Sequence, residues 1–189
     1  MGRIALITGG ARSGKSRYAQ EQASALAAEH GEGRVLFLAT AEVSDEEMRD
    51  RIRRHQQDRP AEWDLREAPL GAAQVVAEID KEYDVILLDC LTIFVSNILY
   101  AARDLTPLEI EAHVDLAIAD LCRAARSGSA DVVLVTNEVG MGLHPMTALG
   151  RLFVDLAGRA NQRVAAAADD VTLMVCGIPV TVKSLDKQP

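Results

Sequence analysis

The hydrophobic pattern of the chain is dominated by short apolar runs that do not alternate with polar residues. Four such runs lie at residues 3–8, 34–39, 84–89 and 131–135. Strands of this kind are buried on both faces, as in a parallel sheet that helices cover from two sides. Three weaker strand signals, the last two predicted to join at Gly177, lie at residues 63–67, 171–176 and 179–182.

Segments with the period of an α-helix separate these strands. Helices are predicted at residues 15–29 (with Gly31 as the C-cap), 44–58, 71–81, 91–102 and 106–126, and after the loop TNEVGMGLHP to about residue 168. Two of these helices begin with capping signals: Ser44 with Glu47, and Thr106 with Pro107 and Glu109. Strands that alternate with helices predict a mostly parallel α/β sheet with right-handed crossovers. We expect one domain at residues 1–183 and a tail at residues 184–189.

A glycine-rich stretch, GGARSGKS at residues 9–16, lies between the first predicted strand and the first predicted helix. It matches the Walker A pattern completely, in the strand–loop–helix context that this pattern requires. Backbone N–H groups and the helix N-terminus would hold phosphate oxygens. Lys15 is expected to reach the β- and γ-phosphates, and Ser16 to ligate Mg²⁺. The predicted fold class is therefore a RecA-like P-loop NTPase, a three-layer sandwich around a mostly parallel sheet.

Two acidic residues, Asp84 and Asp89, lie at opposite ends of one predicted strand. Ligands of open α/β sheets bind at the carboxyl ends of the strands. Asp89 ends the run VILLD and is expected to serve as the Walker B carboxylate, aimed at Mg²⁺ directly or through water. The alternative is a strand-end Asp that caps the next helix. Asp84 begins the same strand and would lie at the wrong end of the sheet.

The segment that follows the predicted strand at residues 131–135 is also expected at the carboxyl ends of the strands. Thr136, Asn137 and Glu138 come first, and Gly140 and Gly142 make the rest of the loop mobile or tightly turned. A switch-like role and a solvated loop are both compatible with this spacing.

Composition narrows the class of protein. The chain of 189 residues has a formal net charge of −8, which argues against nucleic acid as a general partner. Its three cysteines, Cys90, Cys122 and Cys176, show neither zinc spacing nor a disulfide framework, so we expect reduced, mostly buried thiols. No apolar run reaches the length of a membrane span, and no signal sequence precedes the first strand. These observations predict a cytoplasmic protein.

One histidine stands out in an unusually basic segment. In SDEEMRDRIRRHQQDRP, Met48, Ile52 and His55 share one helical face, and Arg51 lies one turn before His55. The pattern alone favours a partly buried histidine on a solvated basic helix. The other histidines have no metal-ligand spacing with one another.

Five segments together give this chain a family resemblance: TGGARSGKSRYAQ, RIRRHQQDRP, VILLDCLT, VLVTNEVGMGLHP and LAGRANQRVAAAADDVTLMVCGIPV. They resemble the bifunctional adenosylcobinamide kinase / adenosylcobinamide-phosphate guanylyltransferase family of cobalamin synthesis. The similarity extends from residue 4 to residue 182. It implies that ATP or GTP phosphorylates the aminopropanol hydroxyl of adenosylcobinamide. GMP from GTP then joins the resulting adenosylcobinamide phosphate through a guanylylated histidine, giving adenosylcobinamide-GDP.

The resemblance also implies roles for single residues. His55 matches the guanylylated histidine, and Lys15 is the other expected catalytic residue. The family forms trimers, so a homo-oligomer is expected. The nucleotide-binding residues implied by the motif and the resemblance together are Gly9, Gly10, Ala11, Arg12, Ser13, Gly14, Lys15, Ser16, Thr40, Ala41, Glu42, Gln56, Gln57, Asp58, Arg59, Glu67 and Asp89. Among them Glu67 is the candidate for reading the N1–H and N2–H edge of guanine, and Ser16 and Asp89 are the candidate Mg²⁺ ligands.

Two other functions fit the Walker A loop. One is a single-step P-loop kinase of small molecules, which would use Lys15 and Asp89 without a covalent histidine. The other is a RecA-like ATP-driven binding protein or switch, for which the acidic charge disfavours DNA as the partner. Covalent labelling of the protein by GTP separates the bifunctional kinase and guanylyltransferase from these two functions.

Overall fold

The computed structural model describes residues 2–31, 33–41, 60–79 and 81–185. Its strands form a seven-stranded sheet in the order β3-β2-β4-β5-β1-β6-β7. All neighbouring strands are parallel except β7, which runs antiparallel to β6. The strands are β1 (Ile4–Gly9), β2 (Val35–Ala39), β3 (Asp64–Glu67), β4 (Val85–Asp89), β5 (Asp131–Val135), β6 (Asp170–Val175) and β7 (Ile178–Lys183).

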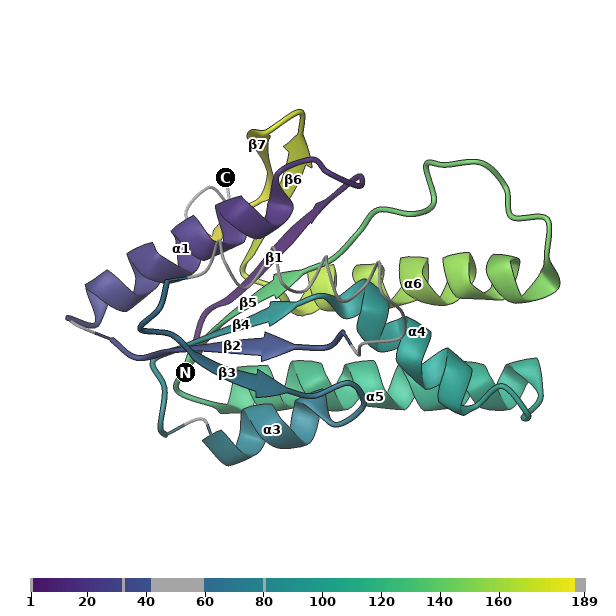
Figure 1. The fold of residues 1–189 in the computed structure, drawn as a ribbon, viewed down its shortest axis with the longest axis horizontal. Coiled ribbons are helices and arrows are strands. Elements are labelled where there is room, and N and C mark those ends of the chain that lie inside the picture. The colour runs from purple at the N-terminus through teal and green to yellow at the C-terminus, as the bar shows by residue number, and fades with distance from the viewer. Residues whose placement is uncertain (1, 32, 42–59, 80, 186–189) are drawn as a thin grey trace.

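Helices cover the sheet from both sides (Figure 1). They are α1 (Lys15–Glu29), α3 (Ala72–Ile79), α4 (Leu91–Ala101), α5 (Pro107–Ser127) and α6 (Ala148–Ala167). The unbroken apolar strands serve both layers: on β4, Ile86 and Leu88 pack in the cluster of α3 to α6, whereas Val85 and Leu87 pack in the cluster of α1. The prediction of a mostly parallel three-layer α/β fold is therefore confirmed.

Most predicted elements are confirmed, with boundaries that shift by one or two residues. The capping box at Thr106 and Glu109 is present, and Pro107 is the first residue of α5. The joint between β6 and β7 is a tight turn in which Cys176 and Gly177 have φ angles of 53° and 82°. The predicted helix at residues 44–58 lies outside the described residues.

Strand β3 begins at Asp64, one residue later than predicted, and Trp63 packs into the core under α1, only 8% exposed. Two local expectations were wrong. His30 is the C-cap of α1, and Gly31 follows it with φ of 88°, a conformation that glycine adopts without strain. Cys176 is exposed rather than buried, because it lies in the turn between β6 and β7. Across the described ranges, no helix is both long and apolar enough to cross a membrane.

Candidate active site

The phosphate-binding loop connects β1 to α1, as its sequence predicts. Gly9, Arg12 and Gly14 have positive φ angles of 149°, 56° and 93°. A Cβ at Gly9 would lie 2.6 Å from the carbonyl oxygen of Met174, so only glycine fits against β6. Gly14 is the N-cap of α1 and offers no side chain to the first N–H groups of that helix. These groups therefore point toward a ligand position, which suits an anion.

Lys15 lies inside this loop and not on the surface of the molecule. Its side chain is 7% exposed, and its Nζ donates a hydrogen bond of 2.6 Å to the carbonyl oxygen of Gly10. Ser16 follows as the next residue of α1. The hydroxyl of Ser13 is buried and has no hydrogen-bond partner among the residues that the structure describes. The loop thus holds a buried cation beside a hydroxyl that a phosphate oxygen could satisfy.

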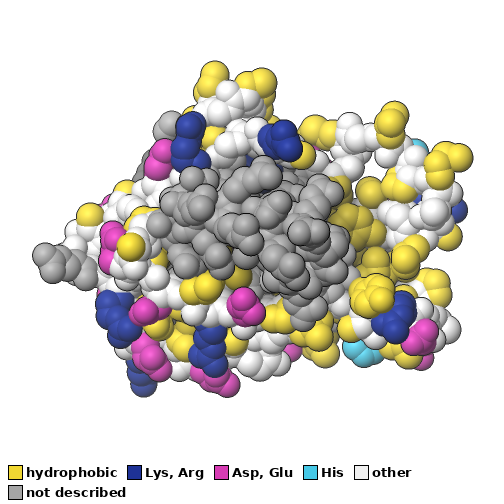
Figure 2. All heavy atoms as spheres, viewed as in Figure 1, with side chains coloured by type: hydrophobic (Ala, Val, Ile, Leu, Met, Phe, Trp, Pro, Cys, Tyr) yellow, Lys and Arg dark blue, Asp and Glu magenta, His cyan; other side chains and the backbone are white. Residues whose placement is uncertain are grey.

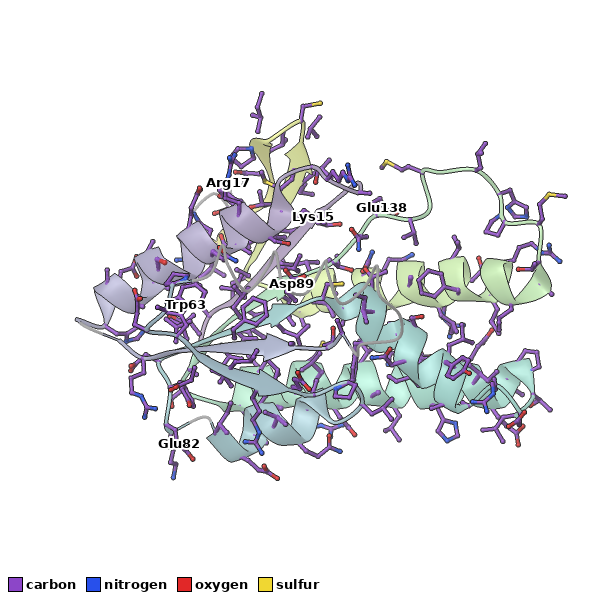
Figure 3. The ribbon with its side chains drawn as sticks, in the orientation of Figure 1. Lys15, Arg17, Trp63, Glu82, Asp89 and Glu138 are labelled. Carbon is purple, nitrogen blue, oxygen red and sulfur yellow. The ribbon has the colours of Figure 1, made fainter. Side chains whose placement is uncertain are left out.

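The sheet register places the predicted strand-end residues along one edge. Glu67 pairs with Ala39, Ala39 with Asp89, Asp89 with Val135, and Val135 with Ile7. Glu67 and Asp89 are therefore two strand spacings apart, about 10 Å. Figure 3 shows Asp89 and Lys15 at this same carboxyl edge. The Walker A loop, Asp89 and Glu67 thus lie at the same edge of the sheet, with Asp89 two strands and Glu67 four strands from β1, and their roles in binding stay predictions.

Thr40 closes the space between β2 and β4. It is fully buried, and its hydroxyl accepts a bond of 2.9 Å from the N–H of Cys90 and donates one of 2.8 Å to the Cys90 carbonyl. The carbonyl of Thr40 accepts a bond of 2.8 Å from the side-chain amide of Asn97 on α4. The Thr40 side chain therefore positions the backbone behind Asp89. A nucleotide contact through its neighbour Ala41 stays a prediction.

A closed ring of hydrogen bonds lies under the segment that follows β5. Thr92 donates to Thr136 (3.1 Å), Thr136 donates to Asn161 Oδ1 (2.7 Å), and the Asn161 amide donates to the carbonyl of Asn137 (3.1 Å). The N–H of Asn137 returns a bond of 2.7 Å to Thr92. Each hydroxyl both donates and accepts, so the buried groups of the ring satisfy one another.

Sequence reasoning missed Thr92, Asn97 and Asn161 in this framework. A signal was present, because each is a polar residue inside an otherwise apolar helical face. Asn161, for example, lies between the buried residues Ala160 and Val164 of α6. Polar residues that are buried, as Thr92 is, or partly buried, as Asn97 and Asn161 are, need partners, but the sequence does not say which element supplies them.

Glu138 comes next to the phosphate loop. Its N–H donates a bond of 3.0 Å to the carbonyl of Gly9, the first residue of that loop. Its carboxylate oxygen Oε1 accepts a bond of 3.0 Å from the N–H of Gly140. Thr136, Asn137 and Glu138 thus lie at the carboxyl edge of the sheet, as expected from the sequence, and the start of this loop is anchored to β1.

The remaining candidates, Glu42, His55 and the residues from Gln56 to Arg59, lie outside the described residues. Within the described part of the chain, no group of three or more His, Cys, Asp or Glu side chains could hold a metal ion by itself. A cation bound by one carboxylate, one hydroxyl, water and nucleotide phosphates needs no such group, and Mg²⁺ is usually bound in this way.

Comparisons with known proteins cover almost the whole chain. The family model described as "Cobinamide kinase / cobinamide phosphate guanyltransferase" matches residues 5–182. CobU of Salmonella typhimurium, a bifunctional adenosylcobalamin biosynthesis protein, is 44% identical over 184 residues, 94% of this chain and 98% of that protein. CobU of Escherichia coli is 42% identical over the same shares. CobP of Pseudomonas aeruginosa is 37% identical over 178 residues, 94% of this chain and 96% of that protein.

Proposed function

The chain belongs to the cobinamide kinase / cobinamide phosphate guanyltransferase family, bifunctional transferases of cobalamin biosynthesis, and from this premise we propose how its residues divide the two reactions. In the first, ATP or GTP phosphorylates the aminopropanol hydroxyl of adenosylcobinamide. In the second, GMP passes from GTP to His55 and then to adenosylcobinamide phosphate, giving adenosylcobinamide-GDP. The observation that carries the proposal is the buried Lys15 inside a complete Walker A loop, at the same edge as Asp89.

In the kinase reaction the loop binds and orients the triphosphate. The N–H groups at the start of α1 meet its oxygens, and the Ser13 hydroxyl gains an acceptor that it lacks among the described residues. Lys15 exchanges the carbonyl of Gly10 for the β- and γ-phosphates, where its charge offsets the charge that develops during transfer.

Ser16 and Asp89 fit Mg²⁺ by the chemistry of their donors. Both supply hard oxygen ligands, and Asp89 ends β4, which is two strands from β1 and its phosphate loop. When bound, the ion would neutralise phosphate charge. Asp89 and the Ser16 hydroxyl would hold it against the loop.

His55 carries the second reaction in this proposal. Neutral imidazole is a nucleophile for the α-phosphorus, and the phosphoramidate that it forms is labile enough to pass GMP on. Pyrophosphate leaves with the electrons of the broken P–O bond. The arginines near His55 in the sequence would offset charge on the triphosphate.

Guanine recognition is proposed for Glu67. A carboxylate can accept hydrogen bonds from both N1–H and N2–H of guanine, and Glu67 is exposed at the carboxyl end of the edge strand β3. Ala41, Glu42 and the residues from Gln56 to Arg59 are proposed to complete the nucleotide site.

Binding of the acceptor adenosylcobinamide and assembly of an oligomer each need protein surface outside the carboxyl edge of the sheet. The loop that leads into α6 exposes Met141, Leu143 and Met146, which are 83%, 97% and 94% exposed. Figure 2 shows hydrophobic side chains gathered over this loop and over the β6–β7 hairpin. Exposed apolar surface of this kind supports a contact with another molecule. We propose that a homo-oligomer, a trimer by family resemblance, covers part of it.

Labelled GTP tests the division of roles. Wild-type protein and the variants His55→Ala, Lys15→Ala and His113→Ala are incubated with GTP labelled in the α-phosphate, without corrinoid. We expect acid-labile, base-stable label on the wild type and on the control His113→Ala, and none on His55→Ala. With adenosylcobinamide and ATP, His55→Ala should still form the phosphate, whereas Lys15→Ala should lose about 10²-fold or more of that rate.

Three results would contradict the proposal. A GMP adduct mapped to another residue, or one that survives in His55→Ala, removes the role of His55. An unlabelled wild-type protein that still phosphorylates adenosylcobinamide favours the single-step kinase. Near-normal kinase activity of Lys15→Ala removes the Walker A role.

A further inference from the structure

Glu138 occupies a position that neither Walker motif explains. Strand β5 lies between β1, which leads into the phosphate loop, and β4, which ends in Asp89. Glu138 follows β5 closely, and its own N–H is bonded to Gly9. Figure 3 shows Glu138, Lys15 and Asp89 at one edge of the sheet, each from a different element. The carboxylate therefore stands beside the loop that we propose for the triphosphate.

The backbone at Glu138 is fixed from two sides. On one side the N–H groups of Thr136 and Glu138 bond to Ile7 and Gly9 at 2.9 and 3.0 Å, which extends the contact between β5 and β1 beyond the strand. On the other side the ring through Thr92 holds both backbone polar groups of Asn137, its N–H and its carbonyl. Glu138 is the last residue of this anchored segment before the loop with the exposed methionines begins.

Among the described residues, the Glu138 carboxylate takes part in one hydrogen bond and in no ion pair. Oε1 accepts the N–H of Gly140, and no Lys, Arg or His of the described segments forms an ion pair with Glu138. The side chain is neither fully buried nor fully exposed. Within the segments that the structure describes, Oε1 is the carboxylate oxygen that accepts a bond, and a carboxylate next to a phosphate site can accept a proton and return it to solvent.

We propose that Glu138 is the general base of the kinase reaction, an inference that rests on the proposed function. As the aminopropanol oxygen forms its bond to the γ-phosphorus, its proton passes to the Glu138 carboxylate. The bond from that phosphorus to the β–γ bridging oxygen breaks, and its electron pair leaves on the nucleoside diphosphate. The proton then passes from Glu138 to water.

The second reaction separates this role from a structural one. There the acceptor is the phosphate of adenosylcobinamide phosphate, whose oxygen is already ionised at neutral pH and has no proton to lose. A base at Glu138 therefore matters for phosphoryl transfer and not for GMP transfer. A residue that only shaped the loop, or only held Mg²⁺, would affect both reactions.

Glu138→Gln tests the base directly. Glutamine keeps an oxygen that can accept the Gly140 N–H, so the loop contact survives while the ability to take a proton is lost. Glu82→Gln is the matched control, because Glu82 is an exposed residue at the opposite edge of the sheet (Figure 3). Each protein is assayed for phosphorylation of adenosylcobinamide by ATP and, separately, for GMP transfer to adenosylcobinamide phosphate supplied ready-made.

We expect Glu138→Gln to lower kcat of the kinase reaction by about 10²- to 10⁴-fold, with little change in KM for ATP. GMP transfer should stay within about threefold of the wild type, and Glu82→Gln should match the wild type in both assays. Glu138→Asp, which keeps a carboxylate on a shorter side chain, should recover part of the kinase rate.

The proposal is overturned if the kinase rate of Glu138→Gln stays within about threefold of the wild type, if both reactions fall together, or if Glu138→Asp is no faster than Glu138→Gln. Failure of the proposed function looks different. In that case wild-type protein would show no phosphorylation of adenosylcobinamide, or no GMP adduct, whatever residue stands at position 138.

Discussion

The sheet has an amino edge, where its parallel strands begin, and a carboxyl edge, where they end. Both edges carry acidic residues, but these have opposite uses. At the amino edge, the carboxylates of Asp84, Asp131 and Asp169 accept bonds from the N–H groups of Arg34, Arg3 and Ile4 at 2.8, 2.6 and 2.8 Å. These aspartates tie the starts of the strands to their neighbours.

Side chains at the amino edge add ion pairs to these bonds. Arg126 donates to both oxygens of Asp169 at 3.0 Å. His30 lies 3.1 Å from Asp131, and Arg3 lies 2.6 Å from Asp170. The charges of this edge are thus largely matched within the fold.

The carboxyl edge is held together by neutral groups instead. Thr40, Thr92, Thr136 and Asn161 form hydrogen bonds with one another or with backbone groups. Strand direction in a parallel sheet therefore decides which edge an acidic residue reaches. Asp84 and Asp89 show this within a single segment, since Asp84 precedes β4 and Asp89 ends it.

Exchanging each of these two aspartates for asparagine gives the sharpest contrast. Asp89→Asn should lower the Mg²⁺-dependent kinase rate by about 10²-fold or more, because a formal charge at the proposed metal position is lost. Asp84→Asn keeps an acceptor for the Arg34 N–H and should leave the rate per folded molecule within about twofold. The measurement is the kinase rate as a function of Mg²⁺ concentration. If Asp89→Asn leaves that dependence unchanged, Asp89 is not a Mg²⁺ ligand.

A second contrast concerns stability rather than rate. Burial raises the pKa of Asp169, but hydrogen bonds from Arg126 and from the Ile4 N–H outweigh it and hold the pKa below its usual range. Asp169→Asn should lower the free energy of unfolding by about 1–3 kcal/mol at neutral pH, because the partly buried Arg126 loses its partner. Both transfer rates per folded molecule should be unchanged.

The pH dependence of that loss gives an independent check. A carboxyl with a lowered folded pKa stabilises the protein above its unfolded pKa of about 3.9 and loses this contribution as pH falls through the folded value. Denaturant unfolding of wild type and Asp169→Asn at pH 7 and pH 3 should therefore show a smaller difference at pH 3. An equal difference at both pH values would mean that the ion pair contributes nothing.

The same comparison explains how much of this molecule its sequence reveals. Apolar runs, glycines and caps are local signals, so the strands, the Walker A loop and the start of α5 were predictable to within a residue or two. Asp89 was predictable because strand direction places it. The ring through Thr92 and Asn161 was not, because its members come from different helices and a strand end, and only the packing of α4 against α6 brings them together.

The smallest expected effect is at His30, and it probes the amino edge alone. The hydrogen bond with Asp131 is the main cause that raises the pKa of His30, and the nearby carboxylates of Asp84 and Glu29 add to it. A histidine with a raised folded pKa stabilises the protein fully below its unfolded pKa of about 6.5 and loses that contribution as pH rises through the folded value. Because the His30 side chain is 40% exposed, solvent screening limits the contribution to a few tenths of a kcal/mol, about the value of a surface ion pair.

NMR titration of the His30 ring should give a midpoint above the usual value for histidine. The difference in unfolding free energy between wild type and His30→Gln should be larger at pH 5.5 than at pH 8.5. A difference that grows with pH would mean that neutral His30, and not the charged pair with Asp131, is what the amino edge uses.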